Sequence, residues 1–291
     1  MLSAKLAVRW RNTMRFIRMF FSNKIGTLGF MMLVFFVLVA FIGPAVYPYD
    51  ITDVAVGDIM APPTRGFLMG TDQLGRDLFG ALIHGAKTSL IVGFFGAGIS
   101  VIIGTILGLS AGYIGGRMDD VLMRFTDGMM VLPMLPLIMV LAALLGTSIF
   151  NIIIVIGLTG WTGTARLVRS QTLSMKERQF VERAKSIGAG NAYIMRKHIL
   201  PNVFPVIFAN SILRTATAIL SEATLSFLGL GDPMAVSWGQ ILNGAFNNGA
   251  VSIGAWWYYV PPGVCIILLV LSFTFLGYSF DEILNPKLRK R

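Results

Sequence analysis

Apolar residues along the chain gather in six long runs that polar segments separate. A helix that crosses a membrane needs about 20 mostly apolar residues, because each residue advances about 1.5 Å through roughly 30 Å of hydrocarbon. Six runs meet this requirement, at residues 25–46, 89–113, 121–145, 149–167, 203–227 and 260–278. Helices are expected because lipid offers no partner for open backbone groups. The pattern therefore predicts an all-α membrane protein with six transmembrane helices.

The composition agrees with this prediction. Hydrophobic residues make up 55% of the 291 residues and charged residues only 13%, against about 25% charged residues in an ordinary soluble domain. A soluble chain would need more polar residues to cover its surface, and a disordered chain would contain far fewer apolar ones. A soluble enzyme and a soluble binding module are therefore excluded as default interpretations.

The net charge of +10 is explained by membrane topology rather than by binding of nucleic acid. Lys and Arg concentrate in the segment 1–24, in the segment 168–202 and in the tail 279–291, whereas the loop 47–88 has only three of them. Basic residues favour the cytoplasmic side of a membrane. We therefore expect both termini and the segment 168–202 in the cytoplasm, and the loops 47–88 and 228–259 outside.

The first apolar run and its basic leader are both long for a cleaved signal peptide, so we expect a retained anchor. Within the leader, residues 10–21 mix Arg at helical spacing with Phe, Ile and Met. This pattern fits either an interfacial helix on anionic lipid or a plain flank that sets orientation. The single cysteine, Cys265, and the distant histidines His84 and His198 predict neither an internal disulfide nor a metal site.

Small residues recur at every fourth position of the second run. They are Gly96, Ser100, Gly104, Gly108 and Gly112. This spacing places them on one face of a helix, where they let another helix approach closely and gain van der Waals contact. The partner helix belongs either to this chain or to another subunit.

A few charged residues fall within or near the predicted spans. Arg124 and Asp127 are spaced so that they can pair on one helix. Arg214 lies near the middle of the fifth run, where a charge costs at least about 2.5–3.5 kcal/mol, so it should face protein or water. It either meets an anionic group of a transported substrate or pairs with an acid on another helix or subunit. Glu222 is a further candidate for such an intramembrane pair or for the pathway.

The segment 174–202 is too polar to cross lipid and too long for a simple turn. Good helix formers precede Gly188, which is a plausible helix terminator, and a second helical stretch is expected over residues 191–199 before Pro201. The pattern predicts two short helices that meet at a glycine corner and project into the cytoplasm. Such a projection is suited to docking on a soluble partner.

This segment resembles the EAA loop in permease subunits of bacterial ABC importers, where the loop forms a coupling helix that fits into a cleft of the ATPase subunit. The residues that the resemblance assigns to docking or loop positioning are Glu182, Arg183, Ala184, Ser186, Gly188, Leu200 and Pro201. Two positions depart from the family pattern. Arg183 stands at the position of the middle alanine, and His198 stands where an aliphatic residue is usual.

Further segments are similar to one branch of that family. Residues 69–77 resemble the G-T-D-x-L-G-R-D segment of the dipeptide, oligopeptide and nickel permeases, and similar segments occur at 222–231, 237–239, 256–263 and 281–289. Together they resemble the second, C-type permease of the pair in these importers. The resemblance implies the type I importer fold, with six helices and the coupling loop.

The resemblance also implies partners and a location. The partners are a homologous second permease, two ATP-binding cassette ATPase subunits that bind ATP and Mg, and an external binding protein. The location is the inner membrane, and the substrate class is short peptides, with nickel, glutathione or oligosaccharides as alternatives. ATP binding in the partners would drive alternating access. This chain alone is expected to be neither an enzyme nor a cofactor-binding protein.

The aromatic residues 256–259 fit either an interfacial belt or a pathway lining. The two external loops form the expected landing surface for a binding protein. Residues 80–88 resemble a phosphate-binding P-loop, but Ala86 separates the glycine from Lys87, so we expect no nucleotide site.

Two rival functions use the same membrane topology. A secondary transporter would use Asp127 or Glu222 as a coupling acid, but no inverted repeat is visible. An ion channel subunit would need a filter-like segment, and none stands out. A tightly bound ATPase is expected only for the importer.

Overall fold

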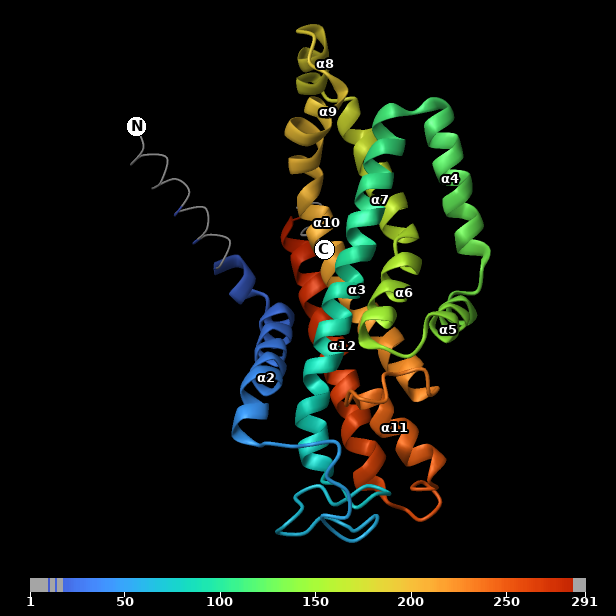
Figure 1. Ribbon diagram of the computed structural model, residues 1–291. Helices are drawn as coiled ribbons and strands as arrows, with labels where there is room; N and C mark the ends of the chain where they lie inside the picture. The colour runs from blue at the N-terminus through green and yellow to red at the C-terminus, as the bar shows by residue number, and fades with distance from the viewer. Residues whose placement is uncertain (1–9, 11–13, 15–17, 285–291) are drawn as a thin grey trace.

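The computed structural model describes residues 10, 14 and 18–284. In this part of the chain every regular element is a helix (Figure 1). The elements are α2 (Lys24–Val46), α3 (Leu78–Ile114), α4 (Gly116–Val131), α5 (Met134–Leu145), α6 (Ile149–Thr159), α7 (Thr162–Lys176), α8 (Gln179–Ser186), α9 (Asn191–Ile194), the π-helical turn η1 (Met195–Ile199), α10 (Leu200–Phe227), α11 (Trp238–Asn247) and α12 (Trp256–Leu284). Residues 11–13 and 15–17 of the predicted interfacial helix at 10–21, and residues 285–291 of the basic tail, lie outside the described residues.

Four of these helices, the spans that contain α2, α3, α10 and α12, are long and apolar enough to cross a membrane by themselves. The number rises to six if the bent pairs α4–α5 and α6–α7 each count as one span. The all-α membrane fold is therefore confirmed.

Helix α3 begins at Leu78, earlier than the expected start of the second span at residue 89. The reason is its N-cap, because the Asp77 carboxylate accepts hydrogen bonds from the backbone N–H groups of Phe79 and Gly80. Residues 78–88, expected in the external loop 47–88, are therefore helical. The P-loop-like residues 80–88 lie inside this helix and form no phosphate-binding loop.

The third span is broken rather than continuous. Helices α4 and α5 meet at an angle of 89°, and Figure 1 shows α5 turned across the direction of α4. The break lies at Leu132 and Pro133, both of which have extended backbone angles. A proline disfavours the helical conformation of the residue before it. The expectation of one helix over residues 121–145 is therefore wrong.

The fourth span is a milder bend of 41° between α6 and α7. Helix α7 continues to Lys176, beyond the expected end at residue 167 and into the segment 168–202 that we expected to be a loop. The physical reason is packing, because Val168 and Thr172 on α7 are fully buried. The helix therefore continues along the length over which its inner face packs against a partner.

That partner is the small-residue column of α3. A β-carbon added at Gly104 would lie 2.7 Å from the Thr164 side chain, and one at Gly112 would lie 2.8 Å from Thr172. Ser100 donates a hydrogen bond to the carbonyl oxygen of Gly157 at 3.0 Å. Gly96 faces Ile156 in the same way. The column thus lies against α6 and α7 of this same chain.

Replacing Gly108 with valine is expected to destabilise this contact. A β-carbon at Gly108 would meet the Ala165 carbonyl oxygen, a backbone atom that cannot move away cheaply. Overpacking of this kind costs about 1–3 kcal/mol, so the thermal midpoint of the detergent-purified protein should fall. Gly98→Val is the matched control, because nothing lies within 4 Å of a β-carbon there. Equal midpoints for the two variants would contradict the packing interpretation.

Different elements lie at the two ends of the helical bundle. Figure 1 shows α8 and α9 at one end, and the loop 47–77 together with α11 at the other. This arrangement agrees with the sequence expectation that the segment 168–202 and the external loops lie on opposite sides of the membrane.

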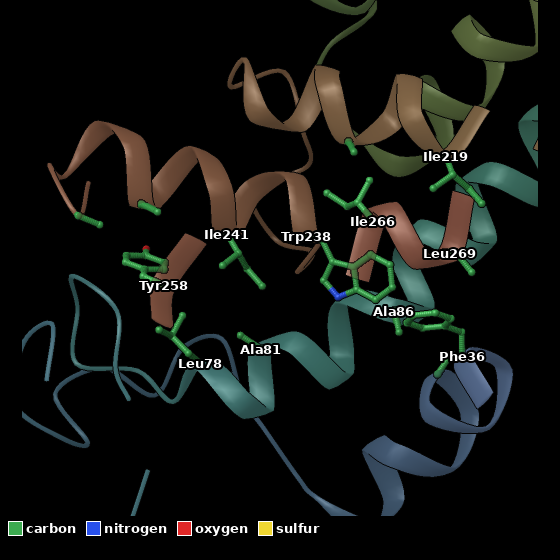
Figure 2. Packing of buried hydrophobic residues seen from close by; sticks show 14 of the residues in the cluster. Phe36, Leu78, Ala81, Ala86, Ile219, Trp238, Ile241, Tyr258, Ile266 and Leu269 are labelled. Atoms are coloured by element: carbon green, nitrogen blue, oxygen red, sulfur yellow. The ribbon is translucent and has the colours of Figure 1, made fainter. Parts of the chain in front are cut away.

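At the α11 end, Trp238 lies in the centre of a buried apolar cluster (Figure 2). Its side chain is 1% exposed, and its ring faces Phe36 of α2 at a centroid distance of 5.6 Å. The indole N–H donates to the Leu82 carbonyl oxygen at 2.8 Å. Gly85 leaves the space for the ring, because a β-carbon there would lie 2.8 Å from Trp238. This residue joins α2, α3 and α11.

The loop around Asp72 is closed by its own hydrogen bonds. The Asp72 carboxylate accepts from the N–H groups of Leu74 and Arg76 and forms an ion pair with the Arg76 guanidinium at 2.6 Å. Gly70 and Gly75 have positive φ angles of 69° and 70°, which glycine adopts readily. The G-T-D-x-L-G-R-D pattern thus encodes a self-supporting loop.

The aromatic residues 256–259 do not behave as one belt. Trp256 is 55% exposed, whereas Tyr258 is 2% exposed and its hydroxyl group contacts Gln73. The expectation of an interfacial belt is therefore wrong for Tyr258, because the loop 47–77 folds over it.

Candidate functional site

The segment between α7 and α10 forms a knob, which we define as residues 179–199. It consists of α8, α9 and η1, and Figure 1 shows α8 and α9 beyond the end of α10. The predicted pair of short helices is present. The second stretch is a single α-turn followed by the π-helical turn η1 rather than one regular helix.

Gly188 ends α8 in the manner of a Schellman motif. Its φ angle is +79°, its N–H donates to the Lys185 carbonyl oxygen at 2.9 Å, and the Ala189 N–H donates to that of Ala184 at 3.0 Å. These two bonds satisfy carbonyl groups that a helix end otherwise leaves unpaired. The glycine corner is therefore a defined turn.

The inner face of the knob is apolar. Val181 and Ala184 of α8 are 0% and 5% exposed, and they belong to a cluster with Ile194, Ile199 and Val203. The spacing of three residues puts Val181 and Ala184 on one side of the helix. Ala184 was expected to dock on a partner, but the structure turns it inward. Its small size instead lets α8 lie close to the rest of the knob.

The outer face carries the remaining docking candidates. Glu182, Arg183 and Ser186 are exposed, and no atom lies within 4 Å of a β-carbon added at Gly188. The Ser186 hydroxyl donates back to the Glu182 carbonyl oxygen at 3.0 Å. Leu200 begins α10 half-buried, and Pro201 follows it exposed, in the first turn, where the missing N–H costs nothing.

Sequence reasoning missed an apolar surface on the knob. Ile187 is 85% exposed at the corner, and Tyr193 and Phe180 are 56% and 39% exposed. The His198 ring lies 5.7 Å from that of Tyr193 and 6.3 Å from that of Phe180. His198, at a position where the family pattern has an aliphatic residue, thus places its ring beside two aromatic side chains. The sequence did contain one signal of this surface, because the apolar Ile187 directly precedes Gly188, which ends the helix.

Asp127 pairs with a different arginine from the one expected. Its carboxylate contacts the Arg166 guanidinium of α7 at 2.5 Å, and Asp119 likewise contacts Arg169 at 2.5 Å. The expectation that Asp127 pairs with Arg124 is therefore wrong. Spacing along one helix could not reveal that a basic residue of a neighbouring helix lies closer. Asp127 ties α4 to α7.

Glu222 is buried rather than facing a cavity. Its side chain is 1% exposed, and it accepts hydrogen bonds from the hydroxyl groups of Ser89 at 3.1 Å and Ser226 at 2.8 Å. A buried carboxyl group with such partners is held in one place. It joins α10 to α3.

Arg214 is the candidate that lines open space. It borders a cavity of about 260 Å³ together with the hydroxyl-bearing residues Ser100, Thr162, Thr217 and Ser221. Among the described residues no carboxylate forms an ion pair with it. The expected structural pair with an acid is therefore not found within this part of the chain, and the pair with an acid on another subunit stays a prediction.

Comparisons with known proteins show the family of the chain. The family described as "Binding-protein-dependent transport system inner membrane component" matches residues 104–290, and the N-terminal TM domain of oligopeptide transport permease C matches residues 10–63. The dipeptide transport system permease protein DppC of Bacillus subtilis is 38% identical over 271 residues, which are 92% of this chain and 84% of that protein.

Two further relatives have a similar sequence identity to this chain. The oligopeptide transport system permease protein OppC of Haemophilus influenzae is 38% identical, covering 93% of this chain and 87% of that protein. The di/tripeptide transport system permease protein DppC of Pseudomonas aeruginosa is 36% identical, covering 92% and 90%.

Proposed function

Because the chain belongs to the family of binding-protein-dependent transport system inner membrane components, we propose that it is a permease subunit of an ATP-driven importer that moves short peptides across the inner membrane. The observation that carries this proposal is the knob, a folded projection with an exposed apolar tip at one end of a membrane-spanning bundle. Names of relatives that transport dipeptides and oligopeptides support the substrate class over nickel, glutathione or oligosaccharides.

The proposed complex contains four further subunits and delivers substrate from one side. A homologous permease pairs with this chain, two ATPase subunits hold ATP and Mg, and an external binding protein supplies peptide. The basic segments and both termini face the cytoplasm, where they contact anionic lipid and the ATPases. The loop 47–77 and α11 then face outward, toward the binding protein.

The proposed mechanism uses the knob as the coupling element. Closure of the ATPases on ATP moves the docked knob, and the buried cluster around Val181 and Ile199 passes that motion to α10 and to Leu109 of α3. The membrane bundle then changes between inward-open and outward-open states. The chain itself carries out no chemical step.

A reconstitution experiment tests the proposal. The permease is purified from its own membrane with any ATPase subunits that remain bound, and the complex is placed in proteoliposomes with the binding protein. We expect uptake of labelled trialanine only with hydrolysable ATP. Uptake driven by a proton or sodium gradient without ATP, or purification without any bound ATPase, would support the secondary transporter instead.

A further inference from the structure

We propose that Arg214 is a transient binding site for the C-terminal carboxylate of a peptide in passage, and that the adjoining hydroxyl groups accept hydrogen bonds from the N–H groups of that peptide. The inference rests on the proposed function and names a specificity-determining residue within it. Its basis is a polar stripe, a cavity and a cation that forms no ion pair with any carboxylate among the described residues.

The stripe lies on one face of α10. It consists of Asn210, Arg214, Thr217, Ser221 and Thr224, whose alternating steps of four and three residues repeat the turn of a helix. Polar groups on a membrane-spanning helix face protein or water, because exposure to hydrocarbon is unfavourable. This face of α10 is therefore not directed at lipid.

The hydroxyl groups of the stripe have a defined polarity. Thr217 donates its hydrogen to the Arg214 carbonyl oxygen at 2.9 Å, and Ser221 donates to that of Thr217 at 3.0 Å. Each hydroxyl hydrogen is thus used within α10, which leaves oxygen lone pairs for other donors. Backbone amides and the terminal ammonium group of a peptide are such donors.

The guanidinium group of Arg214 supplies the complementary donors. It lies against Gly163, beside the break between α6 and α7, and a side chain at Gly163 would displace it from this position. The two acids that the sequence singled out within the spans are already engaged, because Asp127 pairs with Arg166 and Glu222 is held by serine hydroxyls. An uncompensated guanidinium group in a membrane bundle favours an anion, and a carboxylate fits its fork of donors.

An apolar cavity continues the polar one. A second space of about 250 Å³ is lined by Leu135, Ile138, Ser221 and Leu225, among others, and shares Met134 and Ser221 with the first. The combined lining offers a cation at one point, hydrogen-bond acceptors beside it and apolar walls beyond. This sequence of chemistry matches the terminus, main chain and side chains of a short peptide.

An uptake assay on the whole complex tests the carboxylate site. Wild type and the variants Arg214→Gln, Arg214→Lys and Arg124→Gln are compared with trialanine and with trialanine amide, each supplied on saturated binding protein. Loss of a charged hydrogen-bond partner should lower trialanine uptake by about tenfold or more in Arg214→Gln, with little change for the amide. Arg214→Lys should keep much of the uptake, and Arg124→Gln should match wild type.

A labelling assay reads the cavity without requiring transport. In a Cys265→Ala background, Ser221→Cys provides one thiol beside Arg214. An anionic methanethiosulfonate reagent should modify it faster than a cationic one, and Arg214→Gln should lower that ratio about tenfold, whereas Arg124→Gln should not. This readout separates failure of the site from failure of the proposed function, because it holds even for a complex that moves no peptide.

Three outcomes would overturn the site. Equal loss of trialanine and its amide would mean that Arg214 has only a structural role. Unchanged trialanine uptake in Arg214→Gln would mean that no carboxylate binds there. Absence of any preference for the anionic reagent would mean that an acid from the second permease neutralises the arginine or that the cavity excludes water.

Discussion

Replacing Gly188 with aspartate is expected to leave the protein in the membrane but to separate ATP hydrolysis from uptake. The substitution adds a carboxylate at an exposed corner where nothing within 4 Å obstructs it, so the fold of the knob has room for the side chain. The φ angle of +79° strains a side-chain-bearing residue by roughly 1–2 kcal/mol, and Asp is among the residues that tolerate it. The effect should therefore arise where the knob meets its partner.

The expected size follows from docking energetics. A residue at the centre of an interface contributes about 2 kcal/mol or more, so ATP-dependent uptake should fall by about thirtyfold. The amount of protein in the membrane and the ATPase activity of the complex are measured in parallel. Both should stay near the wild-type values while uptake is lost.

Two companion variants isolate the cause. Gly188→Asn keeps the left-handed backbone without the charge, and Gly190→Asp adds the same charge where φ is −68° and the space is also open. Aspartate at Gly190 also suits the N-cap of α9. We expect both variants to retain more uptake than Gly188→Asp. Normal coupled transport in Gly188→Asp would refute the docking role.

Replacing Trp238 with alanine should cause the largest loss of stability. The ring is 1% exposed and lies among buried groups of α2, α3 and α12 (Figure 2). Removing a buried aromatic side chain costs about 3–5 kcal/mol, from lost burial and the cavity left behind. The free energy of unfolding, measured by denaturant titration in mixed micelles, should fall by this amount.

The matched control is Trp256→Ala. Trp256 is 55% exposed, so the same change should alter the free energy of unfolding by no more than about 0.5 kcal/mol. Trp238→Phe should lie between the two, because it keeps most of the ring but loses the hydrogen bond to Leu82. A small effect of Trp238→Ala would mean that the cluster does not hold these helices together.

Hydropathy predicted the spans that consist of a single helix and failed at the two bent pairs. The spans around α2, α10 and α12 were found because each contains a long, mostly apolar run within a single helix. The 89° break at Pro133 was not, because hydropathy reports how apolar a segment is and not its direction. The early start of α3 depended on the carboxylate of Asp77, a polar residue that a search for apolar runs ignores.

Among the site residues, features that depend on sequence neighbours were predictable, and contacts between distant segments were not. The corner at Gly188 was predictable, since a helix terminus depends on neighbouring residues. The partner of Asp127 was not, because Arg166 lies on another helix. Arg214 was found as an anomaly of charge within an apolar run, but only the fold shows that a cavity and the bare backbone of Gly163 surround it.

Gly163 has a mechanical consequence. It lets the Arg214 side chain of α10 rest on the backbone of α7, and these two helices are also the ones that enter and leave the knob. The two helices also touch where the Thr164 hydroxyl of α7 donates a hydrogen bond to the Asn210 side chain of α10 at 2.9 Å. A displacement of the knob would therefore act on both helices at these contacts, beside the cavity that Arg214 lines.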